Sequence, residues 1–248
     1  MDSERVFTEI YGKNVWGDGS SNSPRSGDGS KPENAKPYVH FVQSIVKSYG
    51  INSVLDLGHG DWVMWQDYKF EDVVYIGIDV ALGLSEEIGH RFANENRRFF
   101  HNSVFDSGLP KVDLVISKEV FQHLSNQDVI EKLKEINEFK FLILSNAYYS
   151  NKLIFERVKY WIQLRVRLNK LLHLKNPLYK VKPLRNNTDI ITGEFRGLDL
   201  ERSPFIEHLM NYEIVEKFDY PGRKGSASQI RTYFLVRQDA HLEDKVRA

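Results

Sequence analysis

The sequence predicts an α/β fold with an open, mostly parallel sheet, an antiparallel closing strand, helices on both faces and a helical or irregular insertion. Short apolar runs, among them VVYIGID, DLVIS and FLILS, have the continuous hydrophobic character of parallel strands that are covered on both faces. Stretches with helical spacing separate these runs, which is the order of elements in alternating α/β proteins. With 248 residues, of which 41% are hydrophobic, the chain can build one sizeable core.

The N-terminal residues 1–37 are expected to hold one short helix, Ser3 to Tyr11, followed by a loop. The stretch from Trp16 to Ser30 is rich in Gly, Ser, Asp and Asn, which is the composition of turns and mobile loops. Its glycines would let it close over a bound ligand, so it is a candidate lid, with a disordered tail as the alternative. The main domain then covers 38–248 and begins with an amphipathic helix, Tyr38 to Tyr49, that ends at a glycine.

The central part of the chain alternates between predicted strands and helices. Helical spacing predicts helices from Glu86 to Arg97 and from Gln127 to Glu138. Two strand-like stretches near the end, 213–220 and 230–238, are separated by a Pro-Gly turn and should form an antiparallel pair at one edge. The five earlier strands are expected at Ser53–Leu57, Val73–Asp79, Arg98–Ser103, Val112–Ser117 and Phe139–Asn146.

An insertion of about residues 148–205 separates the fifth strand from the closing pair, and such insertions often carry substrate. It should begin with a long helix and continue irregularly, because Pro177 and Pro183 forbid regular helix. The segment from Arg157 to Arg185 contains nine basic residues and no acidic one. It could form a solvated helix face, a surface for acidic glycans or phosphorylated lipid-linked intermediates, or a peripheral membrane contact.

The amino-acid composition excludes several kinds of site and bears on the expected partners and location. Cysteine is absent, so disulfides, thiolate zinc sites and cysteine nucleophiles are excluded. Lys plus Arg and Asp plus Glu both number 34, so the chain has no overall attraction to nucleic acid, and we expect no such partner. No run of about 18 apolar residues occurs and the first twenty residues are polar, so we expect no transmembrane segment, no signal peptide and a cytoplasmic location.

The strongest motif is a pair of glycines just past the first strand with an acid at the end of the second. Gly58 and Gly60 follow the first strand, where bare backbone lets a ligand lie close, and Asp79 closes the next strand. An acid about 20 residues after the first glycine can accept hydrogen bonds from both ribose hydroxyls. The spacing predicts a nucleoside-containing ligand, the alternative being a simple turn and a helix cap at Asp79.

The expected nucleoside ligand is not a dinucleotide. The dinucleotide fingerprint needs a third glycine, and that position is Val63, with bulky Trp62 and Trp65 nearby. Asp56 lies two residues before Gly58 and is expected to face the crevice, where its carboxylate would attract a positively charged group. S-adenosyl-L-methionine, which carries a positive sulfonium, meets this requirement.

At this point the sequence resembles the class I S-adenosylmethionine-dependent methyltransferases. VLDLGHGD is similar to the family's glycine-rich first motif, YIGID to its ribose-binding acid, and DLVISKEVFQHLS to its fourth strand with the following helix. The resemblance covers about Val39 to Asn146 and the closing strands, and it implies a Rossmann-like methyltransferase sheet. VWGDG, SGDGS and Asn187-x-Asp189 with GEFRGLDLERSPF also resemble bacterial methyltransferases associated with polysaccharide biosynthesis.

The resemblance implies a set of cofactor-binding residues and two departures from the family pattern. His59 lies between the glycines at a position that is commonly cysteine in the family. The acidic position after the third strand, which would contact the adenine amine, is Ser103, so that either Ser103 or its neighbour Asn102 would hold adenine. Lys118, at the end of the fourth strand, is also assigned to the cofactor site.

Methyl transfer to an alcohol needs a base, and two residues are candidates. Glu119 and His123 are spaced i, i+4 on the helix expected after the fourth strand, so both could face the crevice. His123 is the first choice for the general base because its ordinary pKa lies near neutrality, and Glu119 could orient it. Alternatively, His123 packs against the sheet and Glu119 contacts the methionine part of the cofactor.

The acceptor would bind at the same edge of the sheet. Asn146, Tyr148 and Tyr149 end the fifth strand and could hydrogen-bond a sugar, although tyrosines at such positions also shield the core. In the irregular stretch, the charged residues that could line the acceptor pocket are Asp189, Glu194, Arg196 and Asp199. No spacing signature supports a metal site, and we predict none.

These expectations combine into one function with two alternatives. The chain is predicted to be an O-methyltransferase that moves a methyl group from S-adenosyl-L-methionine to a hydroxyl of a sugar in a surface polysaccharide or its precursor. The first alternative is an N- or O-methyltransferase of a small metabolite. The second is a cofactor-binding protein without activity, for which His59 and Ser103 are the only indications.

Overall fold

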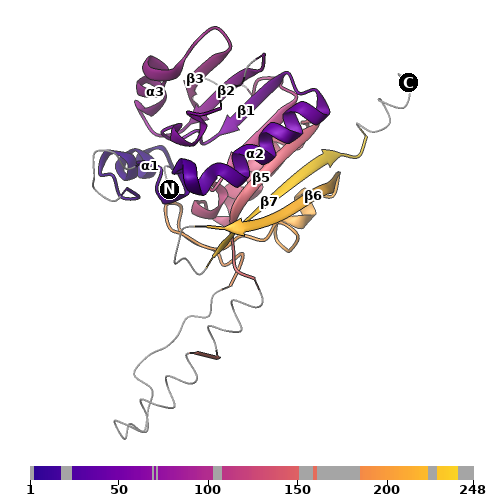
Figure 1. Ribbon diagram of the computed structural model, residues 1–248. Coiled ribbons are helices and arrows are strands. Elements are labelled where there is room, and N and C mark those ends of the chain that lie inside the picture. Colours follow the sequence, from indigo (N-terminus) through magenta and orange to yellow (C-terminus); the bar gives the residue numbers. More distant parts are fainter. Residues whose placement is uncertain are drawn as a thin grey trace, which may run out of the picture.

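Seven strands form one mixed sheet in the computed structural model, which describes residues 3–17, 24–68, 70, 72–102, 108–150, 159–160, 185–222 and 228–239 (Figure 1). The strands are β1 (Ser53–Leu57), β2 (Val74–Asp79), β3 (Arg97–His101), β4 (Leu114–Lys118), β5 (Phe141–Tyr148), β6 (Tyr212–Pro221) and β7 (Gln229–Arg237). Their order is β3-β2-β1-β4-β5-β7-β6, with β1 to β5 parallel and β7 antiparallel to both neighbours. The predicted fold class is confirmed.

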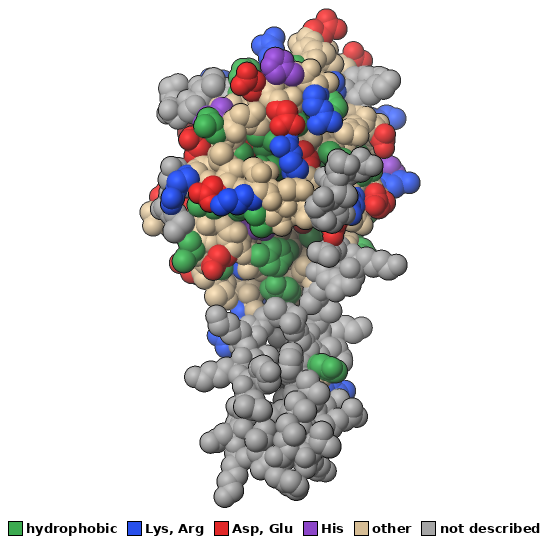
Figure 2. Space-filling view, turned by 90° about the vertical axis from the view of Figure 1, so that its left-hand side faces the viewer, with side chains coloured by type: hydrophobic (Ala, Val, Ile, Leu, Met, Phe, Trp, Pro, Cys, Tyr) green, Lys and Arg blue, Asp and Glu red, His purple; other side chains and the backbone are tan. Residues whose placement is uncertain are grey.

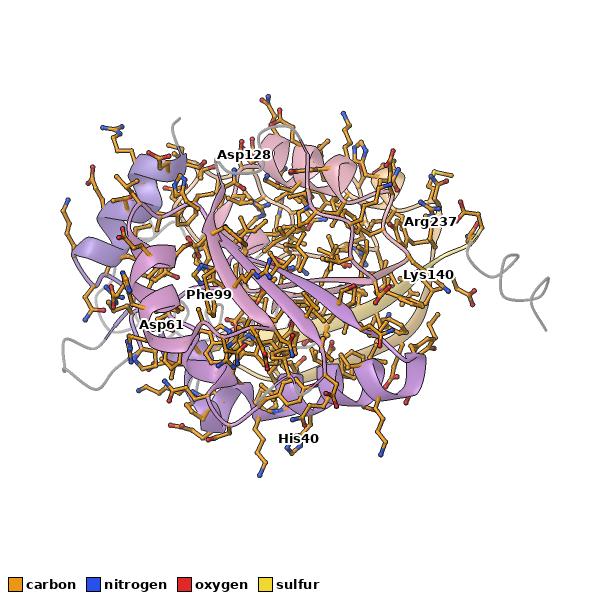
Figure 3. All side chains as sticks on the ribbon, turned by 90° about the horizontal axis from the view of Figure 1, so that it is seen from above. His40, Asp61, Phe99, Asp128, Lys140 and Arg237 are labelled. Carbon is orange, nitrogen blue, oxygen red and sulfur yellow. The ribbon has the colours of Figure 1, made fainter. Side chains whose placement is uncertain are left out.

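Helices cover both faces of this sheet. The helices are α1 (Ser3–Gly12), α2 (Pro32–Tyr49), α3 (Leu84–Phe92) and α4 (Asn126–Glu135) among the described residues. His40 of α2 and Asp128 of α4 lie on opposite sides of the sheet in Figure 3. The apolar stripe of α2, with Val39, Val42 and Val46, is buried in the core. Between the helices, every residue of β4 and β5 is buried, as expected for central strands.

The described helices differ from their predicted bounds, most of all at the start of α2 and at the end of α3. α2 begins at Pro32 instead of Tyr38, because Pro32 occupies the first turn, where a missing N–H costs nothing, and the helix continues through Pro37. α3 ends at Phe92 instead of continuing to Arg97. There Asn94 Oδ1 accepts the N–H of Asn96 at 3.0 Å, and this local turn leads directly into β3.

The helix expected to carry Glu119 and His123 does not form, so that prediction is wrong. Glu119 has a positive φ of 58° and donates its N–H to Ser145 O of β5 at 2.6 Å, so it continues the strand pairing before the chain turns. A single 3₁₀ turn, Phe121–His123, follows. Helix α4 begins only at Asn126, where the Ser125 side chain accepts the Asp128 N–H at 3.1 Å and caps the helix.

The topology places a ligand site at one edge of the sheet. The chain runs from β1 outward to β2 and β3 and then returns to β4 on the other side of β1. Ligands bind outside the carboxyl ends of parallel strands at such a switch point. Asp61, just past β1, lies at the end of the molecule opposite Lys140 and Arg237 in Figure 3. The site is therefore expected beside the loops that follow β1 and β4.

The surface carries charges of both signs. On the coloured part of the face shown in Figure 2, acidic and basic side chains are interspersed, in agreement with a formal net charge of zero. None of the helices in the described part of the chain combines the length and the apolar character that crossing a bilayer requires. Most of the basic segment Arg157–Arg185 and of the expected long helix lies outside the described residues, so those predictions stay open.

Candidate active site

A cavity of about 670 Å³ lies at the carboxyl ends of β1 and β4. Much of its lining comes from α1 with its C-terminal extension, from Ser26–Ser30, from the loop after β1 and from the turn after β4. The end of β2, Asn102, Ala147 of β5, the start of β7, residues of α4 and Phe195 complete the wall. This volume is within the range of roughly 300–1,000 Å³ that is common for small-molecule sites.

The glycine loop after β1 has a backbone that other residues adopt poorly. Gly58 has a φ of 81° and Gly60 a φ of 58°. The N–H groups of Gly58 and His59 both donate to Ile78 O of β2, at 2.8 and 3.3 Å, which keeps the loop against the end of β2. A Cβ atom at Gly60 would collide with Ser26 Oγ, so this position also has no room for a side chain.

Both carboxylate oxygens of Asp79, at the end of β2, accept hydrogen bonds from backbone N–H groups. Its Oδ2 accepts the Gly60 N–H at 3.1 Å and its Oδ1 accepts the Ala81 N–H at 2.9 Å. Each carboxylate oxygen has a second lone pair, so the group can still accept hydrogen bonds from a diol. Asp79 is only 6% exposed and lines the cavity.

His59 anchors the glycine loop to the neighbouring helix. Its ring is buried, with Nδ1 at 2.7 Å from Gly60 O and Nε2 at 2.8 Å from Ser85 Oγ of α3. The ring also packs edge-on against Phe99 of β3, with 5.2 Å between ring centroids. Burial lowers the pKa of His59, whereas the nearby Asp79 carboxylate raises it. Imidazole bridges these partners with two nitrogens, which a cysteine side chain cannot do.

The N-terminal residues cover the glycine loop. Ser26 N–H donates to Asp61 Oδ2 at 3.1 Å, and Asp61 N–H donates back to Ser26 Oγ at 2.9 Å. Tyr11 of α1 shares a hydrogen bond of 3.0 Å with the same Ser26 hydroxyl. Lys118 Nζ donates to Gly29 O at 3.0 Å and fastens the segment to the end of β4. Residues 26–30 thus occupy the position expected for a lid, while 18–23 lie outside the described residues.

His123 also lines the cavity and lies among aromatic rings. Trp16 packs on it with ring centroids 4.7 Å apart and 33° between the ring planes, and Phe195 lies at 5.7 Å. Burial lowers the pKa of His123, and the Arg196 guanidinium lowers it further, whereas the carboxylate of Glu119 raises it. At neutral pH, the imidazole is therefore uncharged and able to accept a proton.

Comparisons with known proteins give similarity in structure alone. No protein-family model and no curated protein matches the sequence. Magnesium protoporphyrin IX methyltransferase of Synechocystis, solved with bound SAH, matches with a TM-score of 0.57 and 16% identity over 95% of this chain and 98% of its own. The N-methyltransferase NodS of Bradyrhizobium japonicum, in complex with S-adenosyl-L-homocysteine, matches with a TM-score of 0.58 and 10% identity. This match covers 96% of this chain and 100% of NodS. A putative sarcosine dimethylglycine methyltransferase of Galdieria sulphuraria matches with a TM-score of 0.53 and 11% identity. This match covers 96% of this chain and 99% of the other.

The chain has the class I methyltransferase fold. The matches cover nearly the whole chain, and the mostly parallel sheet with an antiparallel β7 agrees with the Rossmann-like methyltransferase sheet that the resemblance implied. In this methyltransferase fold, the cavity contains eight of the residues that were predicted for the cofactor and for catalysis. These are Gly58, His59, Gly60, Asp79, Asn102, Lys118, Glu119 and His123. Their roles stay predictions, and Ser103 lies outside the described residues.

Asp56 does not face the cavity of the methyltransferase fold, contrary to expectation. Its side chain is 1% exposed, and its Oδ2 accepts hydrogen bonds from Tyr75 OH at 2.7 Å and Trp65 Nε1 at 3.1 Å. Both partners are fully buried, so the Asp56 side chain points into the packed core. Burial raises the pKa of Asp56 to about 6.

Replacing Asp56 with asparagine is expected to stabilise the protein at pH 8 by about 2 to 3 kcal/mol, using ~1.4 kcal/mol per pKa unit. The folded state keeps the proton up to about pH 6, whereas an unfolded aspartate loses it near 3.8, so stability is lost as the pH rises between these values. The side-chain oxygen of asparagine can accept the hydrogen bonds from Tyr75 and Trp65 that Oδ2 accepts, and the amide group carries no charge. Urea denaturation at pH 4 and pH 8 measures the difference, which should vanish at the lower pH.

The exposed Asp67 provides the matched control for this change. The same substitution there should alter stability by less than about 0.5 kcal/mol at either pH, as expected for a surface position. An Asp56 variant that is no more stable than the unmodified protein at pH 8 would show that the buried carboxyl is not destabilising.

The predicted acceptor residues lie behind the wall of the cavity and do not line it. Asn146 Oδ1 accepts the Gln122 N–H at 3.2 Å, and Tyr148 packs under the Arg231 guanidinium, 3.5 Å from its ring centroid. Asp189 accepts the Asn126 N–H at 2.8 Å at the start of α4. Arg196 is 3% exposed and donates to Leu124 O at 2.6 Å. The contacts of Asn146, Asp189 and Arg196 support the chain on either side of His123, and substrate contact by the four residues stays untested.

Several cavity residues were not predicted as site residues. Gln122 stands beside His123, and Tyr11 and Ser26 come from the N-terminal part of the chain. No local pattern marks these positions, because their place depends on contacts with residues far away in the sequence. The part of the chain that the structure describes contains no group of three or more acidic or histidine side chains that could hold a metal ion.

Proposed function

We propose that this chain is an S-adenosyl-L-methionine-dependent O-methyltransferase that acts on a sugar hydroxyl in a surface polysaccharide or its precursor. The observation that carries this proposal is that one cavity, at the switch point of the sheet, is lined both by the glycine loop with Asp79 and by His123, whose pKa is lowered by burial. The first group suits an adenosyl cofactor and the second an alcohol acceptor.

The residues present fit the cofactor. Asp79 can accept hydrogen bonds from the two ribose hydroxyls, and the bare backbone at Gly58 and Gly60 permits close approach. The described lining contains seven carboxylates and two lysines, an excess of negative charge that attracts a sulfonium. When bound, S-adenosyl-L-methionine supplies a methyl group on a positively charged sulfur. Three of the matching structures were solved with this molecule or its demethylated product.

The protein residues position the acceptor and move its proton. His123 takes the proton of the acceptor hydroxyl on its uncharged imidazole as the oxygen gains the methyl group. Closure by residues 26–30 and by Trp16 excludes water from the cavity, which strengthens the interactions of charged groups there.

The lining favours a neutral or amino sugar over an acidic one. Trp16, Phe195 and the ring of His123 offer apolar faces on which the C–H face of a sugar ring can pack. Asp128 and Glu131 of α4 line the same cavity and can accept hydrogen bonds from hydroxyl or ammonium groups. A uronic acid would bring a further negative charge into a cavity with an excess of carboxylates.

The second candidate function is an N- or O-methyltransferase of a small metabolite. The acidic lining supports it, because the same carboxylates would attract an amine. The matching structures include an N-methyltransferase and an enzyme named for sarcosine and dimethylglycine.

A methyl-transfer screen with isotopically labelled S-adenosyl-L-methionine tests these functions. The acceptors are neutral oligosaccharides, amino sugars, uronic acids and small amines. Label in an ether-linked methyl group of a neutral or amino sugar is the expected result, and label on nitrogen of a small amine would establish the second candidate. Cofactor binding without label in any acceptor class would favour a binding protein without activity.

A further inference from the structure

The side-chain amide of Gln122 has a fixed orientation. Its Oε1 lies 2.6 Å from the backbone nitrogen of Ala147 in β5. A backbone N–H can only donate, so the atom that faces it must be the amide oxygen, and the NH₂ group points the other way. That group lies 3.3 Å from Nε2 of His123. The sheet edge therefore presents a hydrogen-bond donor to one nitrogen of the histidine.

The other nitrogen of His123 meets an acceptor. Nδ1 lies 2.9 Å from Glu194 O, and a carbonyl oxygen can only accept, so Nδ1 carries the proton. In the uncharged ring, Nε2 then has the free lone pair, which is the form that can accept a hydrogen bond from Gln122. The polarity of the chain from Ala147 N–H to Glu194 O assigns the tautomer of His123 without any hydrogen being located.

Gln122 is itself held rigidly. It is 3% exposed, its backbone N–H donates to Asn146 Oδ1 at 3.2 Å, and its backbone carbonyl accepts the Arg196 N–H at the same distance. Two of its partners, Asn146 and Ala147, belong to the fully buried strand β5. The amide is thus anchored to a fully buried strand, while its NH₂ group reaches a residue of the cavity wall.

We propose that Gln122 is a positioning residue for His123: its amide holds the imidazole in the tautomer with the lone pair on Nε2 and releases that atom to the acceptor hydroxyl. This inference rests on the proposed function, in which His123 is the base. The separation of 3.3 Å between the two nitrogens is at the long end for a hydrogen bond, so a hydroxyl can replace the amide at small cost.

The charged groups around His123 are compatible with this role. Glu119 on the preceding turn raises the pKa of the ring, and Arg196, on the segment packed behind it, lowers the pKa after the larger effect of burial. Trp16 and Phe195 contribute uncharged rings. The two neutral contacts thus act together on the tautomer, because Glu194 O accepts from Nδ1 and the Gln122 amide donates to Nε2.

Two variants of Gln122 and one control test the proposal. Gln122→Glu keeps the acceptor for Ala147 N–H but offers Nε2 a carboxylate, and Gln122→Met removes the polar contact at similar length. Gln238→Glu makes the same chemical change at an exposed position directly after β7. This position lies near the start of β5, at the end of the strands away from the cavity. Circular dichroism and thermal unfolding establish that each variant is folded.

The first readout is ¹⁵N NMR of His123 in the full chain without cofactor. We expect an unprotonated Nε2 in the unmodified protein and in the control. In Gln122→Met a measurable population should carry the proton on Nε2, although Glu194 O still favours the proton on Nδ1. In Gln122→Glu the pKa of His123 should rise by about one unit, because a carboxylate stabilises the imidazolium. A proton on Nε2 in the unmodified protein, or an unchanged tautomer in Gln122→Met, would overturn the proposal.

The second readout is the pH profile of kcat/KM with an acceptor found in the screen. The acidic limb should move up by about one unit in Gln122→Glu, and kcat of Gln122→Met should fall by about 10-fold with the cofactor Kd unchanged. An acidic limb that stays in place while the NMR pKa moves would remove His123 from the base role. That outcome would contradict the proposed function and leave the tautomer assignment standing. The tautomer assignment is tested by the NMR spectra alone.

Discussion

Replacing His123 with alanine is expected to lower kcat of methyl transfer by about 100-fold or more while the affinity for S-adenosyl-L-methionine stays the same. A positioned base contributes roughly 10²- to 10⁴-fold to proton transfer, and His123 lines the cavity together with the glycine loop. Its lowered pKa keeps it uncharged at neutral pH, so the loss should be visible over the whole range above about pH 6.5. Steady-state turnover and calorimetric titration with the cofactor measure the two quantities.

His123→Phe is the matched control for packing. The phenyl ring can keep the contact with Trp16, whose ring centroid lies 4.7 Å from that of His123, but it cannot accept a proton. Both variants should therefore lose activity to a similar extent if proton transfer is what His123 supplies. Activity that survives in His123→Phe but not in the alanine variant would assign the residue a purely structural role at this wall of the cavity.

Replacing Asp79 with alanine is expected to weaken S-adenosyl-L-methionine binding by about 10-fold or more. A hydrogen bond to a charged group contributes about 1.5–3 kcal/mol, and ~1.4 kcal/mol corresponds to a factor of ten in affinity. Asp79 is buried at the end of β2 and holds the Gly60 N–H, so its removal also loosens the glycine loop. Isothermal titration calorimetry with the cofactor gives the change in Kd directly.

Asp79→Asn separates binding from the support of the loop. Asparagine retains one oxygen that can accept the Gly60 or the Ala81 N–H, but it has no charge and one acceptor fewer for a diol. We expect an intermediate loss of affinity with little change in the thermal unfolding midpoint. If both variants are folded and bind the cofactor as tightly as the unmodified protein, the assignment of Asp79 to the ribose is wrong.

The strands and the glycine motif follow from local patterns in the sequence. The predicted strand Ser53–Leu57 has the observed bounds, and the other strand predictions differ from the structure by a few residues at their ends. Continuous apolar runs identify buried parallel strands because the same few neighbours decide the burial of each residue. Asp79 and Gly60 meet as expected because their strands are adjacent and parallel.

The arrangement around His123 depends on contacts that no local pattern records. Glu119 leaves helical geometry because its N–H pairs with Ser145, 26 positions further along the chain, in the neighbouring strand β5. The partners of Gln122 and His123 likewise come from β5 and from residues 194–196. A spacing of four residues is helical only if the backbone has no better hydrogen bonds available, and here the sheet provides them.

The sequence by itself determined the fold class, the position of the cofactor motif at the ends of β1 and β2, and the residue types that the chemistry needs. Tertiary structure alone decided which of these side chains face the cavity. It turned Asp56 into the core, placed Ser26 and Trp16 over the site, and set Gln122 against His123. Periodicity encodes how a segment buries its apolar face, whereas the direction of a polar side chain depends on partners that folding brings from distant parts of the chain.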